Sequence, residues 1–403
     1  MNLFENLRLS HELLNGIKRL GFTKPTQIQE KSIPSIIQGK DVIGESATGS
    51  GKTLAFGCGI IEHVTPRQGL QALILTPTRE LAEQVKEALK QLTRQLKIIS
   101  IYGGVAIDPQ IEGLTQCEVA VATPGRLLDH LGRGTIDTSK IKLLVLDEAD
   151  RMFDMGFIDD VEKIIRACPK KRQTLFFSAT ISDRIKNLAQ KYMENPTKVS
   201  ATKMVDPTKL TQVYYDVQRG MKISLLVHLL QKEKSGLVMV FCNTRRNTDY
   251  VAKNLKANKV RAIAIHGGFT QNKRTRTINM FNDGKISVLV CTDVAARGLD
   301  IDNVSHVYNY DIPKDAVDYV HRIGRTARAG EEGKAINLLC NFDHDNFSRI
   351  LAEYRDFKIE KEIMPRVERA ISVRVDDRRG NRGPQRGHSR GRRSSSNRQR
   401  RRW

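Results

Sequence analysis

One short stretch limits the possible folds of this chain more than any other. Residues 41–44 form a short apolar run, residues 46–53 (Ser-Ala-Thr-Gly-Ser-Gly-Lys-Thr) follow, and a helical pattern begins at Leu54. A strand, a glycine-bearing turn and a helix in this order are the setting of a phosphate-binding loop. Glycine lets the backbone approach a phosphate, and N–H groups of the turn and the helix N-terminus converge on the anion. The alternative is an ordinary glycine-rich turn with an exposed Lys52.

The polar residues of this loop have separate expected tasks. Lys52 adds a positive charge for the outer phosphates, and the Thr53 hydroxyl is a candidate ligand for Mg²⁺. The strict pattern has glycine six residues before the lysine, where this chain has Ser46. The residues expected to bind the phosphates are Ser46, Ala47, Thr48, Gly49, Ser50, Gly51, Lys52 and Thr53.

Alternating patterns predict an α/β protein with two domains. Short apolar runs at 72–75, 98–102, 119–122, 143–146 and 174–177 alternate with amphipathic stretches such as 80–96, and the alternation resumes at 237–241, 262–265, 288–291, 307–310 and 335–339. Strands that are apolar on both sides indicate a parallel sheet covered by helices on both faces. A chain of 403 residues suits two domains with a remainder. The expected divisions are a domain at 1–200, a linker at 201–211, a domain at 212–365 and a tail at 366–403.

The charge of the chain indicates its partners. The net charge is +22, and residues 371–403 hold 12 Arg, no Lys and 2 Asp, which gives +10 and leaves +12 for the rest. Such an excess of cations favours polyanions, of which nucleic acid is the commonest. The tail is rich in Arg, Gly and Ser with few apolar residues, so we expect it to be disordered and to add non-specific RNA affinity. The alternative is a tail that only aids solubility.

Other features concern the compartment. No run of about 18 apolar residues is present, which argues against a membrane span, and the first residues lack the pattern of a secretory signal. The six cysteines are scattered without a Cys-x-x-Cys pair, as expected for buried thiols in a reducing compartment and not for a zinc site or disulfides. We therefore expect a cytoplasmic protein without membrane contact.

A second acidic element follows the predicted strand at 143–146. Residues 147–150 are Asp-Glu-Ala-Asp, at a strand end where an α/β sheet presents its chemistry. We assign Asp147 to Mg²⁺ and Glu148 to the attacking water, which it orients and deprotonates. The alternative is an acidic cap on a helix at 151–158. The pairing with the phosphate loop favours the catalytic interpretation.

These residues, with a series of short motifs in the same order, resemble the DEAD-box RNA helicases over nearly all of 1–345. The resemblance implies two tandem RecA-like domains, each a mostly parallel sheet flanked by helices, that use ATP and Mg²⁺ to unwind or remodel RNA locally and non-processively. Residues 21–29 are similar to the family's Q motif, which implies that Gln29 contacts the adenine edge and that Phe4 stacks near the base. Phe22 joins them in the nucleotide-binding set. Without the resemblance, Gln29 is an ordinary polar helix residue.

Three segments of the first domain each follow a predicted strand and suit a sugar–phosphate backbone, because they offer hydroxyls, glycine N–H groups and Arg. In the family such segments hold RNA, and their alternative is ordinary turn chemistry. The expected contacts are Pro77, Thr78, Arg79, Gly104, Thr123, Gly125 and Arg126. Ser178 and Thr180, with Asp150 and His321, are expected from the family to couple hydrolysis to strand separation.

The second domain has a matching set, which the resemblance assigns. The expected RNA contacts are Thr244, Gln271, Arg274, Thr292 and Arg297, and Gly298 and Asp300 are expected at the ribose. Residues 321–328 are similar to motif VI, and we expect Arg325 and Arg328 to share one face of a helical turn and to act as arginine fingers on the γ-phosphate. Departures from the family are Ala327 for a usual Gly, Gly268 for a usual Asp and Ser46 for a usual Ala. Gly268 places one interdomain or RNA contact in doubt.

The expected partner is RNA, single-stranded and duplex, held by its backbone without sequence preference. Ribonucleoprotein, ribosomal and RNA-decay components are further candidates. Two alternatives stay open: a DNA-directed helicase or translocase, against which the Q motif argues, and an ATP-dependent RNA clamp that rarely unwinds. In each case we expect the phosphate loop and the arginine fingers to lie on different domains that ATP and RNA bring together.

Overall fold

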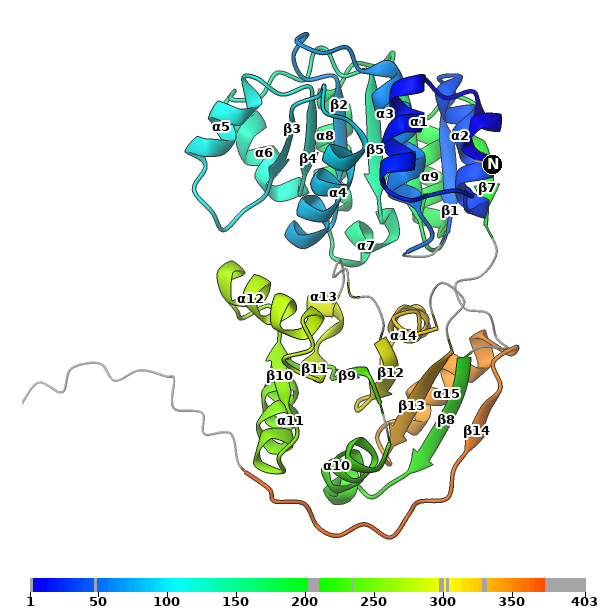
Figure 1. Cartoon of the computed structure of the whole chain (residues 1–403), viewed down its shortest axis with the longest axis vertical. Coiled ribbons are helices and arrows are strands. Elements are labelled where there is room, and N and C mark those ends of the chain that lie inside the picture. Colours follow the sequence, from blue (N-terminus) through cyan, green and yellow to red (C-terminus); the bar gives the residue numbers. More distant parts are fainter. Residues whose placement is uncertain are drawn as a thin grey trace, which may run out of the picture.

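The computed structural model describes residues 3–46, 49–201, 210–233, 235–296, 301, 304–327 and 332–373, and it consists of two α/β domains, one above the other in Figure 1. The expected linker residues 202–209 and the tail from 374 lie outside the described residues. No helix in the described part of the chain is both long and apolar enough to cross a membrane. The two-domain α/β prediction is confirmed.

The first domain is built on a seven-stranded sheet with the order β3-β4-β2-β5-β6-β1-β7, and its printed strand pairings are all parallel. The strands are β1 (Val42–Glu45), β2 (Ala72–Leu75), β3 (Ile98–Ile101), β4 (Val119–Ala122), β5 (Leu143–Asp147), β6 (Gln173–Ser178) and β7 (Thr197–Ser200). Their apolar side chains are buried on both faces, as expected for a parallel sheet between helices.

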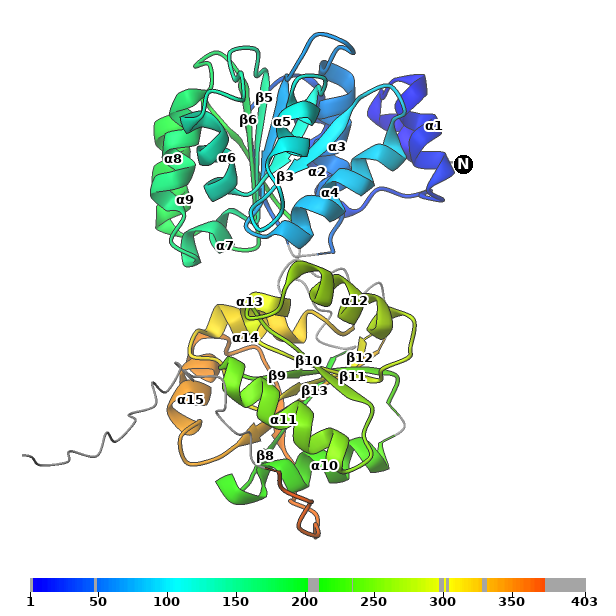
Figure 2. The same cartoon turned by 90° about the vertical axis from the view of Figure 1, so that its left-hand side faces the viewer.

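Two layers of helices cover this sheet, as Figure 2 shows. One layer contains η1 (Leu3–Leu7), α1 (His11–Arg19), α2 (Gln27–Ile37), α3 (Lys52–His63) and α4 (Arg79–Leu92). The other contains α5 (Asp108–Leu114), α6 (Pro124–Gly132), α7 (Ala149–Asp154), α8 (Ile158–Ala167) and α9 (Asp183–Tyr192). Each layer buries its apolar stripe against one face of the sheet, which is the main source of stability in such a fold.

The second domain repeats the architecture. Its sheet has the order β10-β11-β9-β12-β13-β8-β14, which is the order of the first sheet when each domain's strands are numbered from one. The strands are β8 (Leu210–Asp216), β9 (Leu237–Phe241), β10 (Ala262–Ile265), β11 (Val288–Cys291), β12 (Val304–Asn309), β13 (Gly333–Leu339) and β14 (Ile359–Lys361). The helical elements are η2 (Arg219–Met221), α10 (Lys222–Lys232), α11 (Arg245–Ala257), α12 (Gln271–Asn282), α13 (Asp293–Ala296), α14 (Ala316–Ile323) and α15 (His344–Glu353).

Several element boundaries differ from the sequence-based ones. The helix expected at 80–96 ends at Leu92, because Thr93 adopts an extended conformation. The helix expected at 151–158 is wrong: α7 ends at Asp154 and α8 starts at Ile158, with Gly156 between them at a left-handed φ of 82°. The expected linker also extends too far, since β8 already begins at Leu210.

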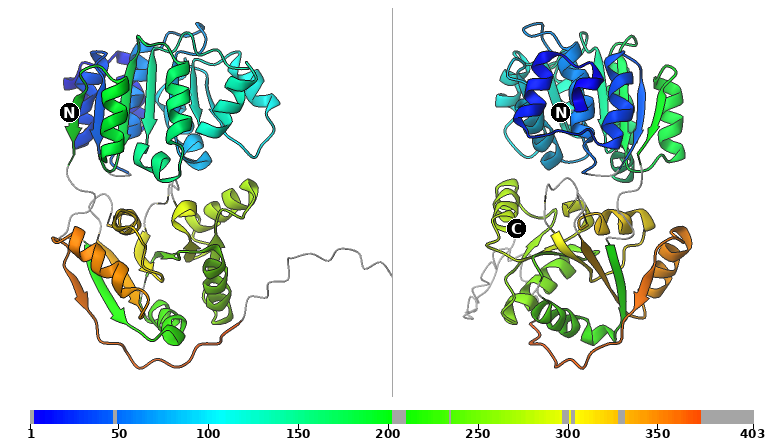
Figure 3. Two further views of the ribbon diagram at one scale, coloured as in Figure 1. Left: turned by 180° about the vertical axis from the view of Figure 1, so that it is seen from behind. Right: turned by 45° about the vertical axis from the view of Figure 1, so that its right-hand side comes forward.

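The tail boundary is the largest difference. Residues 362–373, of which 366–373 were expected to be disordered, form an extended segment that we call the strap. It follows β14 and passes beneath the second domain to the far end of α11 (Figures 1 and 3). Met364, Val367 and Ala370 pack on the core that α10 and α11 share, and so a short alternation of apolar residues is enough to dock this segment.

Candidate nucleotide and RNA sites

The topology brings three motifs of the first domain to one place. Strands β5, β6 and β1 are neighbours in the sheet, and they run parallel. Their carboxyl ends therefore meet at one edge, where ligands of open α/β sheets bind. The phosphate loop follows β1, residues 147–150 begin at the end of β5, and Ser178 ends β6.

The phosphate loop folds around its own lysine. Lys52 is the first residue of α3 and is buried, and its ammonium donates to the carbonyl of Ser46 at 3.0 Å. The hydroxyl of Ser50 donates to that of Ser46 at 2.9 Å. These contacts hold Lys52 at the helix N-terminus, where N–H groups and a cation favour an anion. Ala47 and Thr48 lie outside the described residues.

Gln29 ties the Q motif to this loop. Its side-chain oxygen accepts from the N–H of Thr26 at 2.9 Å and its amide donates to the carbonyl of Gly51 at 2.9 Å. A Cβ on Gly51, whose φ is 89°, would lie 2.2 Å from the Gln29 nitrogen, so both the conformation and the contact require glycine. Gln29 is thus a buried link to the phosphate loop and not an ordinary polar helix residue. Its contact with adenine stays a prediction.

The two aromatic residues assigned to the base differ in position. The Phe4 side chain is 0% exposed and belongs to the core of the first domain, whereas Phe22 is 47% exposed. Of the two rings, that of Phe22 is therefore the one open to solvent. The stacking of Phe4 near the base stays a prediction, as does the contact of Phe22 with the nucleotide.

Asp147 and Glu148, at the acidic strand end, have different surroundings. Burial raises the pKa of Asp147 to about 7, against the opposing charge of Lys52. Its carboxylate accepts from the N–H of Glu148 at 3.0 Å. Glu148 precedes α7 in a left-handed conformation, with φ 52°, which costs a non-glycine residue roughly 1–2 kcal/mol. Glu148 occupies the N-cap position of α7 but its side chain forms no capping bond there, whereas the Asp150 carboxylate accepts from the N–H of Arg151 at 3.0 Å.

Asp150 connects this strand end to the next one. Its carboxylate accepts from the N–H groups of Ala179 and Thr180 at 3.2 and 3.1 Å and from the Thr180 hydroxyl at 3.3 Å. The hydroxyl of Ser178 accepts from the N–H of Asp150 at 3.2 Å. All of these groups are buried or half-buried. These hydrogen bonds connect the first turn of α7 to Ser178 and Thr180. The coupling role expected of these residues stays a prediction.

Sequence reasoning missed the centre of the second domain's site. Arg322 is almost fully buried and forms an ion pair with Asp293 at 2.6 Å, and it donates to Asn243 at 2.8 Å and to the carbonyl of Asp311 at 2.6 Å. Burial opposes its charge, but the Asp293 carboxylate outweighs this effect and raises the pKa of Arg322 above its ordinary value. Arg322 thus joins the ends of β9, α13 and α14. Arg322 lies within the segment 321–328 that resembles motif VI, but its position in that segment did not indicate a function.

Arg325 lies where the two domains meet. A small cavity is lined by Arg151 of α7 and, from the second domain, by Asp293, His321 and Arg325 among others. Arg325 stands in the turn that follows α14, which ends at Ile323, and not on the helix itself. The expected common face of Arg325 and Arg328 stays a prediction. Arg328 lies outside the described residues, as do Arg297, Gly298 and Asp300.

The backbone at Ala327 explains why the family usually has Gly at this position. Its φ is 54°, a left-handed conformation in which glycine is favoured. We expect Ala327→Gly to stabilise the protein by about 0.5–1 kcal/mol, since relief of this strain exceeds the added backbone entropy of glycine. Urea unfolding measures the effect, and a lowered unfolding midpoint would contradict the prediction.

A cleft of about 440 Å³ between the domains collects most of the expected RNA contacts. Its lining includes Pro77, Thr78, Arg79, Thr123, Gly125, Arg126, Gln271 and Arg274. Gly104 lies beside them: a Cβ there would stand 2.1 Å from the Arg79 guanidinium, and its φ of 83° also favours glycine. Thr244 caps α11 by accepting from Asn247, and Thr292 is buried at the start of α13. Neither is among the residues that line the cleft.

Two of these residues bridge the domains. The Arg274 guanidinium lies 2.7 Å from the carboxylate of Glu80, and the Gln271 amide donates to the same carboxylate at 3.1 Å. Both side chains of the ion pair are only 10% exposed, so solvent screens the pair weakly. Contact of Gln271 and Arg274 with RNA stays a prediction, but as described they hold α12 to α4.

This bridge leads to a second prediction. Glu80→Arg is expected to raise the RNA concentration that half-saturates ATP hydrolysis at least several-fold, because closure loses an ion pair and gains a repulsion. The exchanged pair, Glu80→Arg with Arg274→Glu, is expected to recover much of the loss. If Arg274 acted on RNA alone, the exchange would make binding worse than either single change.

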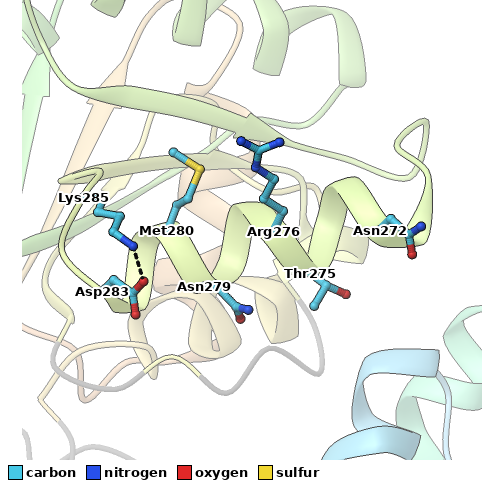
Figure 4. Close-up of a pocket in the computed structure, with 7 residues that line it drawn as sticks. All are labelled: Asn272, Thr275, Arg276, Asn279, Met280, Asp283 and Lys285. Atoms are coloured by element: carbon cyan, nitrogen blue, oxygen red, sulfur yellow. Dashed lines mark hydrogen bonds and ion pairs between the residues drawn. The ribbon is translucent and has the colours of Figure 1, made fainter.

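A shallow depression of about 630 Å³ lies along α12 (Figure 4). It is lined by Asn272, Thr275, Arg276, Asn279, Met280, Asp283 and Lys285, and Lys285 pairs with Asp283 at 2.9 Å. The lining is open and mixed in charge. None of the predicted site residues lies there.

Comparisons with known proteins decide the family. Residues 26–188 match the DEAD/DEAH box helicase model and residues 221–330 the model of the helicase conserved C-terminal domain. The DEAD-box ATP-dependent RNA helicase CshA of Geobacillus kaustophilus is 46% identical over 345 residues, which cover 84% of this chain and 74% of that protein. The chain belongs to the DEAD-box family of ATP-dependent RNA helicases. The predicted resemblance is confirmed.

Further relatives extend the match. CshA of Bacillus subtilis is 45% identical over 342 residues, covering 83% of this chain and 69% of that protein. Among solved structures, S. cerevisiae Dbp5 bound to RNA and ADP BeF3 superposes with a TM-score of 0.83 at 32% identity, over 90% of this chain and 96% of that one. This DEAD-box protein is accordingly an RNA-dependent ATPase and RNA helicase with two RecA-like domains.

Proposed function

We propose that ATP binds at the carboxyl edge of the first sheet and that the second domain completes the catalytic site. Lys52 and the N-terminus of α3 hold the phosphates, Glu148 orients and deprotonates the attacking water, and Arg325 supplies positive charge to the γ-phosphate. The observation that carries this proposal is the small cavity in which Arg151, beside the acidic strand end, meets Asp293, His321 and Arg325 of the other domain.

The acidic strand end also suits a magnesium ion. Mg²⁺ prefers oxygen ligands and keeps several waters, so one hydroxyl and one carboxylate are a sufficient protein contribution. Thr53, the second residue of α3, and Asp147, at the end of β5, are the residues that would hold it. A magnesium ion held there would supply positive charge that offsets the charge of the phosphates. The buried position of Asp147 beside the ammonium of Lys52 is consistent with an ionised ligand once a divalent cation is present.

RNA occupies the interdomain cleft in this proposal. The lining offers hydroxyls, arginines and exposed glycine backbone, which contact phosphate and sugar and do not read bases. We therefore propose binding with little sequence preference, to single strands and to the strand of a duplex that closure distorts. The similarity of the described domain arrangement to Dbp5 bound to RNA and ADP BeF3 supports this placement.

The reaction then follows from the division of the site. Closure joins the two halves, hydrolysis removes the γ-phosphate contact with Arg325, and the weakened interface lets the domains part and release the strand. Each cycle acts locally, because nothing in this sequence of steps moves the protein along RNA. Ribonucleoprotein, ribosomal and RNA-decay components are proposed substrates or partners of this activity.

Strand displacement tests the proposal. A short RNA duplex with a single-stranded overhang is mixed with the protein and ATP, and release of a labelled strand is followed beside ATP hydrolysis. We expect ATP-dependent release of short duplexes, a steep decline with duplex length, and no comparable stimulation by DNA. Hydrolysis stimulated by RNA without any strand release would favour the RNA clamp instead, and equal stimulation by DNA would favour the DNA-directed alternative.

A further inference from the structure

The interdomain cleft contains apolar side chains that a sugar–phosphate backbone does not use. Met155 and Phe157, which follow α7, line it from the first domain, and Phe269 and Val294 line it from the second. Val294 is 50% exposed, and the other three are half-buried. Burial of apolar surface favours binding, and the flat face of a base is the part of a nucleotide that stacks on such side chains. This part of the lining therefore suits a base better than a phosphate.

Phe269 is supported by a histidine that two hydrogen bonds hold in place. The His266 ring accepts from the N–H of Gly268 through Nδ1 at 3.2 Å, and its Nε2 lies 3.1 Å from the carboxylate of Asp249. Because Nδ1 is an acceptor, Nε2 carries the proton that is donated to Asp249. The Phe269 ring packs against this imidazole, with 4.4 Å between the ring centres and 59° between the ring planes. The aromatic ring thus has a fixed support on one side.

A face of the same ring is covered by a lysine. The Lys273 ammonium lies 3.5 Å from the centre of the Phe269 ring. Lys273 is an exposed residue in the first turn of α12, and its charge stands on a flexible four-carbon side chain. A close-packed core side chain resists displacement, whereas an exposed cation can leave an aromatic face for water or for another partner. This ring face is therefore open to exchange with a flat ligand.

The segment that carries Phe269 lies where RNA is expected to pass. It connects β10 to α12, and α12 lies on the side of the second domain that faces the first (Figures 1 and 2). Arg79 and Arg274 line the same cleft from the two domains. Gly268 stands where the family usually has Asp, so a carboxylate that would repel an RNA backbone is missing beside Phe269. Cations for the phosphates and an aromatic face for a base thus occur together.

We propose that Phe269 stacks on one base of the bound RNA, which takes over the ring face that Lys273 covers. Stacking does not read the hydrogen-bonding edge of a base, so it agrees with binding of many sequences. This inference rests on the proposed function, and it adds that the cleft recognises the presence of a base at one position as well as the backbone.

The test is an abasic scan of a short RNA, followed by fluorescence anisotropy with a non-hydrolysable ATP analogue. The strand has about six nucleotides, near the lower end of the site sizes for single strands, which limits sliding. Each member of the set lacks one base and keeps the whole backbone. For the unaltered protein we expect removal at one position to weaken binding by roughly five- to tenfold, the effect of one stacked base, and removal elsewhere to have a smaller effect.

Substitutions identify the side chain that stacks on this base. Phe269→Ala and Phe269→Leu are each expected to weaken binding of the intact strand roughly fivefold and to remove the sensitive position from the scan. Phe269→Trp keeps an aromatic face and is expected to keep that position. Phe342→Ala is the matched control, because Phe342 is a 74% exposed ring of the same domain that is not among the residues lining the cleft. Its removal is expected to leave the scan unchanged.

Three other results would overturn the inference. A flat scan in the unaltered protein would show that no base is stacked, and a sensitive position that survives Phe269→Leu would assign the stacking to another side chain. Weakening of intact and abasic strands alike by Phe269→Ala, with normal binding by Phe269→Leu, would show that the ring only packs against Met155 and Phe157 when the domains close.

Two provisions keep these results separable. Phe269→Leu retains an apolar side chain of similar size, so it replaces Phe269→Ala if the alanine variant does not fold. Failure of the proposed function is read separately, as an absence of ATPase stimulation by a longer single-stranded RNA in the unaltered protein. Normal stimulation together with a flat scan would overturn the stacking of Phe269 alone.

Discussion

Replacement of Arg325 by alanine is expected to lower RNA-stimulated ATP hydrolysis by about 10³- to 10⁵-fold, the range for removal of an arginine finger. The side chain is buried at the domain interface in the cavity with Arg151, Asp293 and His321, so water cannot replace the lost charge. ATP binding is expected to change little, because the phosphate loop lies on the first domain. Steady-state hydrolysis at saturating RNA, with a separate nucleotide-binding titration, measures both effects.

Arg349→Ala is the matched control for this change. Arg349 is an exposed arginine of the same domain on α15, away from the interface. Its removal is expected to leave hydrolysis unchanged. Hydrolysis at the normal rate in the Arg325 variant would show that another group supplies the positive charge, and Arg328 would then be the first residue to examine.

Glu148→Gln is expected to lower hydrolysis by about 10²- to 10⁴-fold, since the amide cannot take a proton from the attacking water. The change keeps the shape of a buried side chain that follows β5 in a strained left-handed conformation. We therefore expect normal ATP and RNA binding, and a protein that stays on RNA longer in the presence of ATP. Single-turnover hydrolysis and RNA dissociation rates measure the two effects.

Glu112→Gln, at an exposed position of α5, controls for the loss of a carboxylate elsewhere. If the Glu148 variant hydrolysed ATP at an undiminished single-turnover rate, Glu148 could not be the base. If instead it failed to bind ATP, the residue would belong to the phosphate site.

Much of the fold and of the site was predictable where the residues that determine a strand or a motif are contiguous in the sequence. Five strands have the first and last residues that were expected from the sequence, at 72–75, 119–122, 237–241, 262–265 and 288–291. A short run that is apolar on both sides fits a buried strand of a parallel sheet and few other elements. The phosphate loop and the acidic strand end were predictable because the residues of each motif are contiguous in the sequence. The topology then brings them to adjacent strands, as β1, β6 and β5 show.

What the sequence left out depends on partners distant in the chain. The role of Arg322 arises from Asp293, Asn243 and Asp311, which no local pattern groups together. The burial of Phe4 and the bridge from Arg274 to Glu80 likewise come from packing between elements far apart in sequence. Residues 366–373 of the strap were assigned to the tail from their composition. Their docking needs only a few apolar side chains and the hydrogen bonds of Asn254 and Asn258 to Val373 and Ile371.

The central claim is that ATP and RNA together bring the two domains face to face. All six cysteines are free and buried, and burial raises the pKa of the Cys58 and Cys291 thiols, so introduced cysteines can be labelled selectively. Dyes at exposed positions on the two domains, Glu112→Cys on α5 and Arg276→Cys on α12, report the distance between domains by energy transfer.

We predict high energy transfer only when RNA and a non-hydrolysable ATP analogue are both present, with a mostly low-transfer population for either ligand alone. The same transfer distribution in all four conditions, with and without each ligand, would contradict the account.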